Sequence, residues 1–136
     1  MRLTASLPTQ RTAPGVARRF VVDALEATAV GFAVVETAEL LTSELVTNAV
    51  IHAGSPAELS VSVFDGSVRV EVTDQAADRP VLRRQSVDAT GGRGLVIVDD
   101  LADRWGVVQI PDDGKTVWFE LRSGPHDRAG STGGNA

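Results

Sequence analysis

The chain has 136 residues, of which 43% are hydrophobic and 23% are charged, and its formal net charge at pH 7 is −5. This is the composition of an ordinary folded domain, and the length is sufficient for one hydrophobic core. The negative charge argues against nucleic acid as the main partner, because phosphate backbones need a basic surface. The absence of cysteine excludes disulfides, cysteine-ligated zinc and thiol catalysis.

The first half of the chain predicts a short strand followed by two helices. Residues Leu3–Leu7 alternate apolar and polar, as expected of a strand at the edge of a sheet. Pro14 suits the first turn of a helix, and apolar residues at helical spacing then predict a helix that ends near Ala27. A longer helix is predicted over Ala33–Ala53, where Gly54 supplies a stop signal.

The second half predicts four strands and one more helix. Asp65-Gly66 is a tight-hairpin signal between two alternating segments. The polar stretch Gln75–Gly92 predicts a loop, Gly94–Ala102 predicts a helix, and Pro111–Gly114 joins the last two strands. The predicted strands are Leu59–Phe64, Val68–Thr73, Arg104–Ile110 and Thr116–Leu121.

This order of elements predicts an α+β protein. Strands that follow one another through short turns pair as hairpins, which favours a mainly antiparallel mixed sheet. About three helices on one face would make a two-layer α/β sandwich. We expect one domain over residues 1–122 and a disordered tail over residues 123–136, which contain four glycines and few apolar residues.

We also expect a cytoplasmic protein. No apolar run in the sequence approaches the length of a membrane span. The N-terminal residues 1–8 lack the apolar stretch of a secretory signal.

Three polar residues recur at intervals of four in the longer predicted helix: Glu44, Asn48 and His52. That spacing places them on one face of a helix. The amide oxygen of Asn48 suits Mg²⁺, and Glu44 could accept or orient a proton of an attacking hydroxyl. The same spacing also fits a solvated helix face, with His52 favoured by the helix dipole. The segment alone leaves both interpretations open.

A glycine cluster, Gly91-Gly92-Arg93-Gly94, stands directly before the last predicted helix. Backbone N–H groups at a glycine-rich helix start can bind phosphate, and Arg93 adds a positive charge there. A hinge without a ligand is the alternative. The cluster is neither a Walker loop nor a dinucleotide fingerprint, because no Gly-Lys-Ser/Thr follows and no initial βαβ strand precedes it.

Asp74 follows the second hairpin strand, where its carboxylate could accept a hydrogen bond from the exocyclic amine of a purine. It could equally start a turn by binding its own backbone. Thr116, after Gly114-Lys115 at the start of the last strand, stays undecided from the pattern alone.

Together these motifs resemble those of the GHKL (Bergerat-fold) ATPase superfamily. The matching segments are, in order, Glu44–Ala53, Asp74, Gly91–Leu95 and Gly114–Phe119, and the resemblance covers roughly residues 3–122. Within the superfamily, the chain is most similar to stand-alone ATP-binding regulators of the anti-sigma-factor serine/threonine kinase type, which are abundant in actinobacteria.

The resemblance implies ATP and Mg²⁺ as cofactors. Glu44 matches the catalytic base, Asn48 matches the Mg²⁺ ligand, and Asp74 matches the aspartate that binds adenine. Thr116 resembles the threonine that supports the adenine site. The full set of candidate cofactor-binding residues is Asn48, His52, Asp74, Asp78, Gly92, Arg93, Gly94, Leu95 and Thr116.

The resemblance also implies partners: a sigma factor, and a small STAS-type antagonist protein that would receive the γ-phosphoryl group on serine or threonine. A homodimer is implied as well, and residues 78–90 would form a lid over ATP. One motif departs from the family. No glycine follows Asp74 where Asp-x-Gly-x-Gly is usual, so Ala76 and Asp78 could crowd the nucleotide.

That departure motivates a second hypothesis, a non-catalytic module that regulates transcription by binding a sigma factor or another regulator without turnover. A third and weaker alternative is the ATP-binding half of a two-component sensor kinase. It ranks last because no phospho-acceptor histidine region precedes the motifs.

Overall fold

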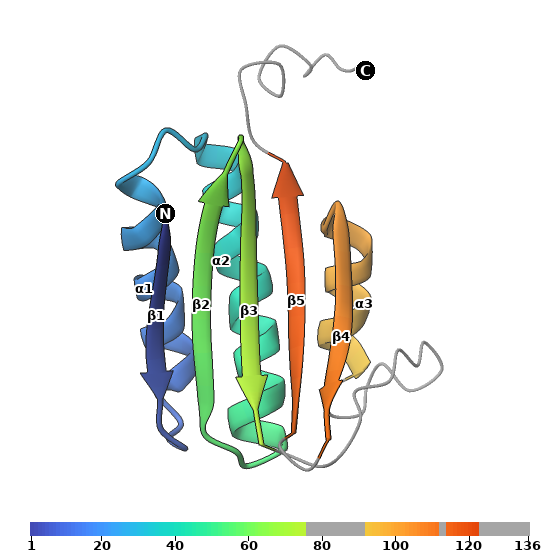
Figure 1. The fold of residues 1–136 in the computed structure, drawn as a ribbon. Helices are drawn as coiled ribbons and strands as arrows, with labels where there is room; N and C mark the ends of the chain where they lie inside the picture. The colour runs from blue at the N-terminus through green and yellow to red at the C-terminus, as the bar shows by residue number, and fades with distance from the viewer. Residues whose placement is uncertain (76–91, 112–113, 123–136) are drawn as a thin grey trace.

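The computed structural model describes residues 1–75, 92–111 and 114–122. They form a two-layer α+β sandwich in which helices cover one face of a five-stranded sheet (Figure 1), which confirms the predicted fold class. The predicted lid and tail lie outside the described residues. The strands are β1 (Arg2–Leu7), β2 (Ala57–Phe64), β3 (Ser67–Asp74), β4 (Arg104–Ile110) and β5 (Gly114–Arg122). The helices are α1 (Ala13–Glu26), α2 (Phe32–Val46), η1 (Thr47–His52) and α3 (Gly92–Leu101).

The sheet has the order β1-β2-β3-β5-β4, and every described pair of neighbours is antiparallel. The sheet that was predicted to be mainly antiparallel is thus wholly antiparallel among these strands. The chain crosses over once, because α3 and β4 lie between β3 and β5 in sequence. As a result, the last residue of β3 stands beside the start of β5, with Asp74 opposite Lys115 in the register.

The core lies between the sheet and the helices, and alternation along the strands builds it. The alternation is complete in β3, where Val68, Val70 and Val72 are buried and the residues between them are only half-buried, whereas in the neighbouring strand β2 the residues from Leu59 to Ser62 are all buried. Helices α1 and α2 add residues at helical spacing, such as Val21 and Leu41, which are fully buried. Burial of these large apolar side chains supplies most of the driving force for folding. Among the described helices, none is long and apolar enough to span a bilayer.

The long predicted helix Ala33–Ala53 is not α-helical throughout. It becomes a π-helix after Val46, and the Ala53 N–H donates to the Asn48 carbonyl oxygen at 3.0 Å. Two consecutive residues of this π-helical segment, Ala49 and Val50, are buried in the core. Apolar periodicity could not reveal this change, because a π-helical turn alters the backbone bonding and not the residue types. Such turns are rare in proteins overall, and those that occur are often at functional sites.

The face of the sheet opposite the helices is polar. Arg69 lies at its centre, where its guanidinium donates to Glu71 Oε2 and to Glu120 Oε2, each at 2.7 Å, and stacks 4.1 Å from the ring centroid of Trp118. Desolvation lowers the pKa of Arg69, but the hydrogen bonds and charges of Glu71 and Glu120 raise that pKa above its usual value overall. The guanidinium therefore stays charged throughout the stable pH range and ties β3 to β5.

Gly114 permits the close approach of β5 to the end of β3. Its φ is +96°, and a Cβ at this position would collide with the backbone carbonyl oxygen of Asp74 and lie 2.6 Å from the Cα of Gln75. Glycine alone avoids both the left-handed strain and this collision. The residue thus sets where β5 begins, and with it which side chain faces Asp74.

We predict that Gly114→Ala lowers the free energy of unfolding by roughly 2–4 kcal/mol, from backbone strain and overpacking together. Gly54→Ala is the matched control, because Gly54 has φ +69° but a Cβ there would meet nothing within 4 Å. That control should lose only about 1 kcal/mol. Urea unfolding followed by tryptophan fluorescence measures both values, and equal losses would show that the close approach does not exist in solution.

Candidate functional site

Asp74 is a buried carboxylate at the end of β3. It continues the alternation of the core valines, so its side chain points to the helix-covered face and is only 2% exposed. A carboxylate removed from water needs a charged or hydrogen-bonding partner. The Nζ of Lys115 supplies one, donating to Asp74 Oδ1 at 3.0 Å.

Lys115 was not singled out from the sequence, although a signal for it was present. Val117, Phe119 and Leu121 alternate as buried residues of β5, and Lys115 continues the same phase toward the N-terminal end of the strand. Its side chain is accordingly 6% exposed and faces Asp74 across the ladder. If the predicted strand had begun at Gly114 rather than at Thr116, the alternation would have placed this lysine on the core face.

Thr116 is not brought together with the Asp74 side chain. It lies one residue further along β5 and therefore on the opposite face of the sheet. There its Oγ1 is 2.7 Å from the Oγ1 of Thr73, in a hydrogen bond between neighbouring strands. The position beside the Asp74 carboxylate belongs to Lys115 instead.

The long helical segment, α2 followed by η1, runs toward the end of the sheet at which β3 ends (Figure 1). Glu44 is in the last part of α2 and Asn48 is in η1, and both are half-buried. His52 closes η1 and is exposed.

Ser55 fastens this helical segment to the strand that carries Asp74. Its backbone N–H donates to the Ala49 carbonyl oxygen at 3.0 Å, and its Oγ accepts the Gln75 N–H at 2.9 Å. Ser55 is itself buried, and its bond to Gln75 is partly buried. The clamp fixes η1 relative to the residue that follows Asp74.

The glycine segment starts a helix, as predicted, but earlier than the apolar pattern suggested. Helix α3 begins at Gly92 rather than Gly94, so Gly92, Arg93 and Gly94 form its first turn. The pattern marked only the first inward-facing residue, Leu95, which is buried in the core. Gly91 and Asp78 lie outside the described residues. The N–H groups of a first helical turn have no partner within the helix, which is the property that an anion site requires.

The described residues contain no group of three or more His, Cys, Asp or Glu side chains that could hold a metal ion by themselves. This fits the way Mg²⁺ is usually bound together with a nucleotide, through one or two protein oxygens, phosphates and water. The amide oxygen of Asn48 is an oxygen donor of that kind. The buried carboxylate of Asp74 is a suitable acceptor for the exocyclic amine of a purine base.

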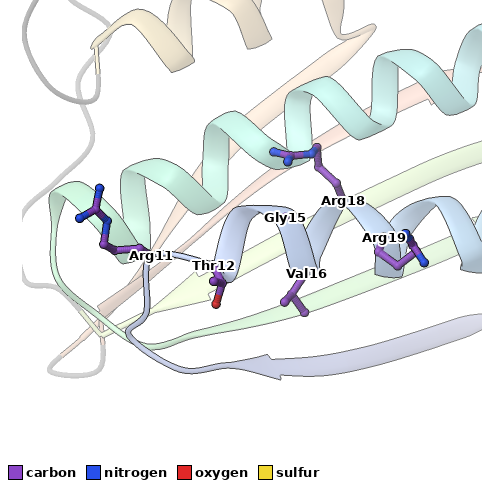
Figure 2. A pocket seen from close by; sticks show the side chains of 6 residues that line it. All are labelled: Arg11, Thr12, Gly15, Val16, Arg18 and Arg19. Carbon is purple, nitrogen blue, oxygen red and sulfur yellow. The ribbon is translucent and has the colours of Figure 1, made fainter.

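A second feature is a shallow hollow over the first half of α1 (Figure 2). Arg18 points toward α2 and donates to Ser43 Oγ at 2.9 Å, next to Glu44 in sequence. The hollow is lined by Arg11, Thr12, Gly15, Val16, Arg18 and Arg19. It shares no residue with the set around Asp74, so it forms a separate, basic surface.

Comparison with known proteins agrees with this architecture. The fold resembles the solved structure of the RsbU and RsbW domains of Rv1364c from Mycobacterium tuberculosis, with a TM-score of 0.69 and 19% sequence identity. The match covers 90% of this chain and 32% of that one, and it shows the likeness of fold alone. No curated protein matches the sequence. The profile of the histidine kinase-like ATPase domain matches residues 7–121, and the chain therefore belongs to this family of GHKL-type ATPases.

Proposed function

We propose that the protein binds ATP with Mg²⁺ and transfers the γ-phosphoryl group to serine or threonine of a partner protein. The observation that carries this proposal is the clamp at one edge of the sheet. Ser55 holds the segment with Glu44 and Asn48 against the strand end that carries the buried Asp74. Membership of the ATPase family supports nucleotide binding as the shared role of these residues.

Each residue of the site has a distinct role in the proposal. Asp74 would accept a hydrogen bond from the exocyclic amine of adenine, and Asn48 would give an amide oxygen to Mg²⁺. The first turn of α3, Gly92–Gly94, would donate N–H groups to phosphate. Bound Mg²⁺ and ATP supply the phosphoryl group and neutralise charge. Glu44 would orient the attacking hydroxyl or take its proton, since such reactions depend mainly on positioning and electrostatics.

The other candidate residues have supporting places in this proposal. His52 and Asp78 would lie at the phosphate and lid side of the nucleotide, as the family resemblance implies. Leu95 is buried, so it would support α3 from the core rather than touch the ligand. Thr116 would act through Thr73 on the far face of the sheet, since its hydroxyl is bonded there.

The proposed partners are proteins. The motif resemblance points to a sigma factor, which the protein would sequester, and to a STAS-type antagonist that would be phosphorylated. A sigma factor as partner would place the protein in the cytoplasm. A homodimer is part of the same proposal.

A second candidate function is a binding module without turnover. Two observations favour it: no glycine follows Asp74 in the sequence, and Lys115 already engages the Asp74 carboxylate. Such a module would keep the fold and its protein partner while ATP plays no part. Calorimetry with Mg²⁺–ATP separates the two functions, because only the first requires binding.

We predict that Glu44→Ala lowers phosphoryl transfer by about 100-fold or more, because a positioned base contributes at least that factor. ATP affinity should change much less. The assay follows labelled phosphate from ATP to the antagonist protein. Glu36→Ala, which removes an exposed carboxylate from the same helix, is the matched control and should keep full activity. Equal rates for the wild type and Glu44→Ala would contradict the catalytic role.

We predict that Asp74→Asn weakens ATP binding by about tenfold or more, because the amide replaces one carboxylate acceptor and removes the charge. Isothermal calorimetry measures the affinity, and circular dichroism checks that the variant is folded. Asp65→Asn is the control: Asp65 is exposed in a turn with φ +51°, a conformation that asparagine also adopts. Unchanged affinity in Asp74→Asn would remove Asp74 from the base site.

A further inference from the structure

The bond between Lys115 and Asp74 uses the same acceptor as the bond proposed for the adenine base, although the lysine donor is charged and the exocyclic amine is neutral. In both cases an N–H group donates to a carboxylate oxygen of Asp74. The ammonium of Lys115 lies 3.0 Å from Oδ1, and both side chains are almost completely buried. A base amine that approaches Oδ1 from the side of Lys115 would therefore have to enter the place that the lysine nitrogen occupies.

Breaking the Lys115–Asp74 ion pair while both side chains stay buried costs free energy. Two charges removed from water are stabilised mainly by each other, and the loss of one leaves the other buried without compensation. A ligand that displaces Lys115 must offer Asp74 an equivalent donor, as an exocyclic amine does. The displaced lysine has a flexible four-carbon stem, which allows its ammonium to reach water.

Among the described strand residues, Lys115 is the one that the sheet register places at this position. The register sets Lys115 directly opposite Asp74, and Gly114 fixes the point at which β5 begins. Thr116 faces the other side of the sheet and is bonded to Thr73. Of these two neighbouring residues of β5, only Lys115 can therefore compete with a ligand for the Asp74 carboxylate.

We propose that Lys115 is an internal competitor of the nucleotide base. It holds the Asp74 carboxylate while the site is empty, leaves when the base binds, and thereby weakens the apparent affinity for ATP. This inference rests on the proposed ATP site. A binding-competent state that is populated only fractionally reduces affinity by that fraction. Lys115 would thus set the ATP concentration at which the protein responds.

The composition of the chain provides a direct test in the wild type. Lys115 is the only lysine in the sequence, so amine-selective acetylation modifies this residue and the N-terminal amine of Met1 alone. Mass spectrometry of peptides follows both rates with and without Mg²⁺–ATP. We expect ATP to speed modification of Lys115 by about tenfold or more, because the freed ammonium becomes accessible. Met1, which is exposed, should react at an unchanged rate.

A variant supplies the second arm. Lys115→Ala should bind Mg²⁺–ATP about tenfold or more tightly than the wild type, whereas Lys115→Arg, which keeps the charge, should not. If ATP binds the wild type but slows or leaves unchanged the acetylation of Lys115, the competition is overturned and the ATP site stands. Weaker ATP binding by a folded Lys115→Ala has the same meaning. If neither the wild type nor this variant binds ATP, the inference and the proposed function both fail.

Discussion

The buried pair of Asp74 and Lys115 is the interaction on which the candidate site depends. A carboxylate at this depth needs charged or hydrogen-bonding partners, and the Lys115 ammonium, 3.0 Å away, is one of them. The partner in turn exists only because β5 returns beside β3 after an intervening helix and strand. The sheet topology therefore determines the chemistry of the site. The strand order that closes the core also decides which side chain faces the Asp74 carboxylate.

Around this pair, backbone constraints position the remaining elements. Gly114 lets β5 start against the end of β3, and Ser55 ties the π-helical turn to the residue after Asp74. The π-helical turn carries Asn48 and directly follows the helix that carries Glu44, so a local change in backbone bonding lies within the proposed phosphate and metal region. Irregular backbone of this kind persists where the surrounding structure holds it in place, and it gathers at functional sites.

The two faces of the sheet carry different interactions, and only one of them carries the candidate site. The helix-covered face carries the core and, at one end, the Asp74–Lys115 pair. The other face holds β3 to β5 through the Arg69, Glu71, Glu120 and Trp118 contacts. Because successive residues of a strand alternate between these faces, a shift of one residue moves a side chain from one task to the other. Thr116 and Lys115 show this directly, since only the second reaches Asp74.

Local patterns in the sequence determined the element order, the fold class and the family. Alternating valines fixed β3, and Asp65-Gly66 fixed the hairpin, because these signals act between near neighbours. The motif residues Glu44, Asn48 and Asp74 were also evident, since their types and order are properties of the chain alone. Only the tertiary structure decided which groups meet. The Ser55 clamp joins residues 20 positions apart, and the pairing of Lys115 with Asp74 joins residues 41 positions apart. Contacts over such separations follow from strand order and register, which no local pattern specifies.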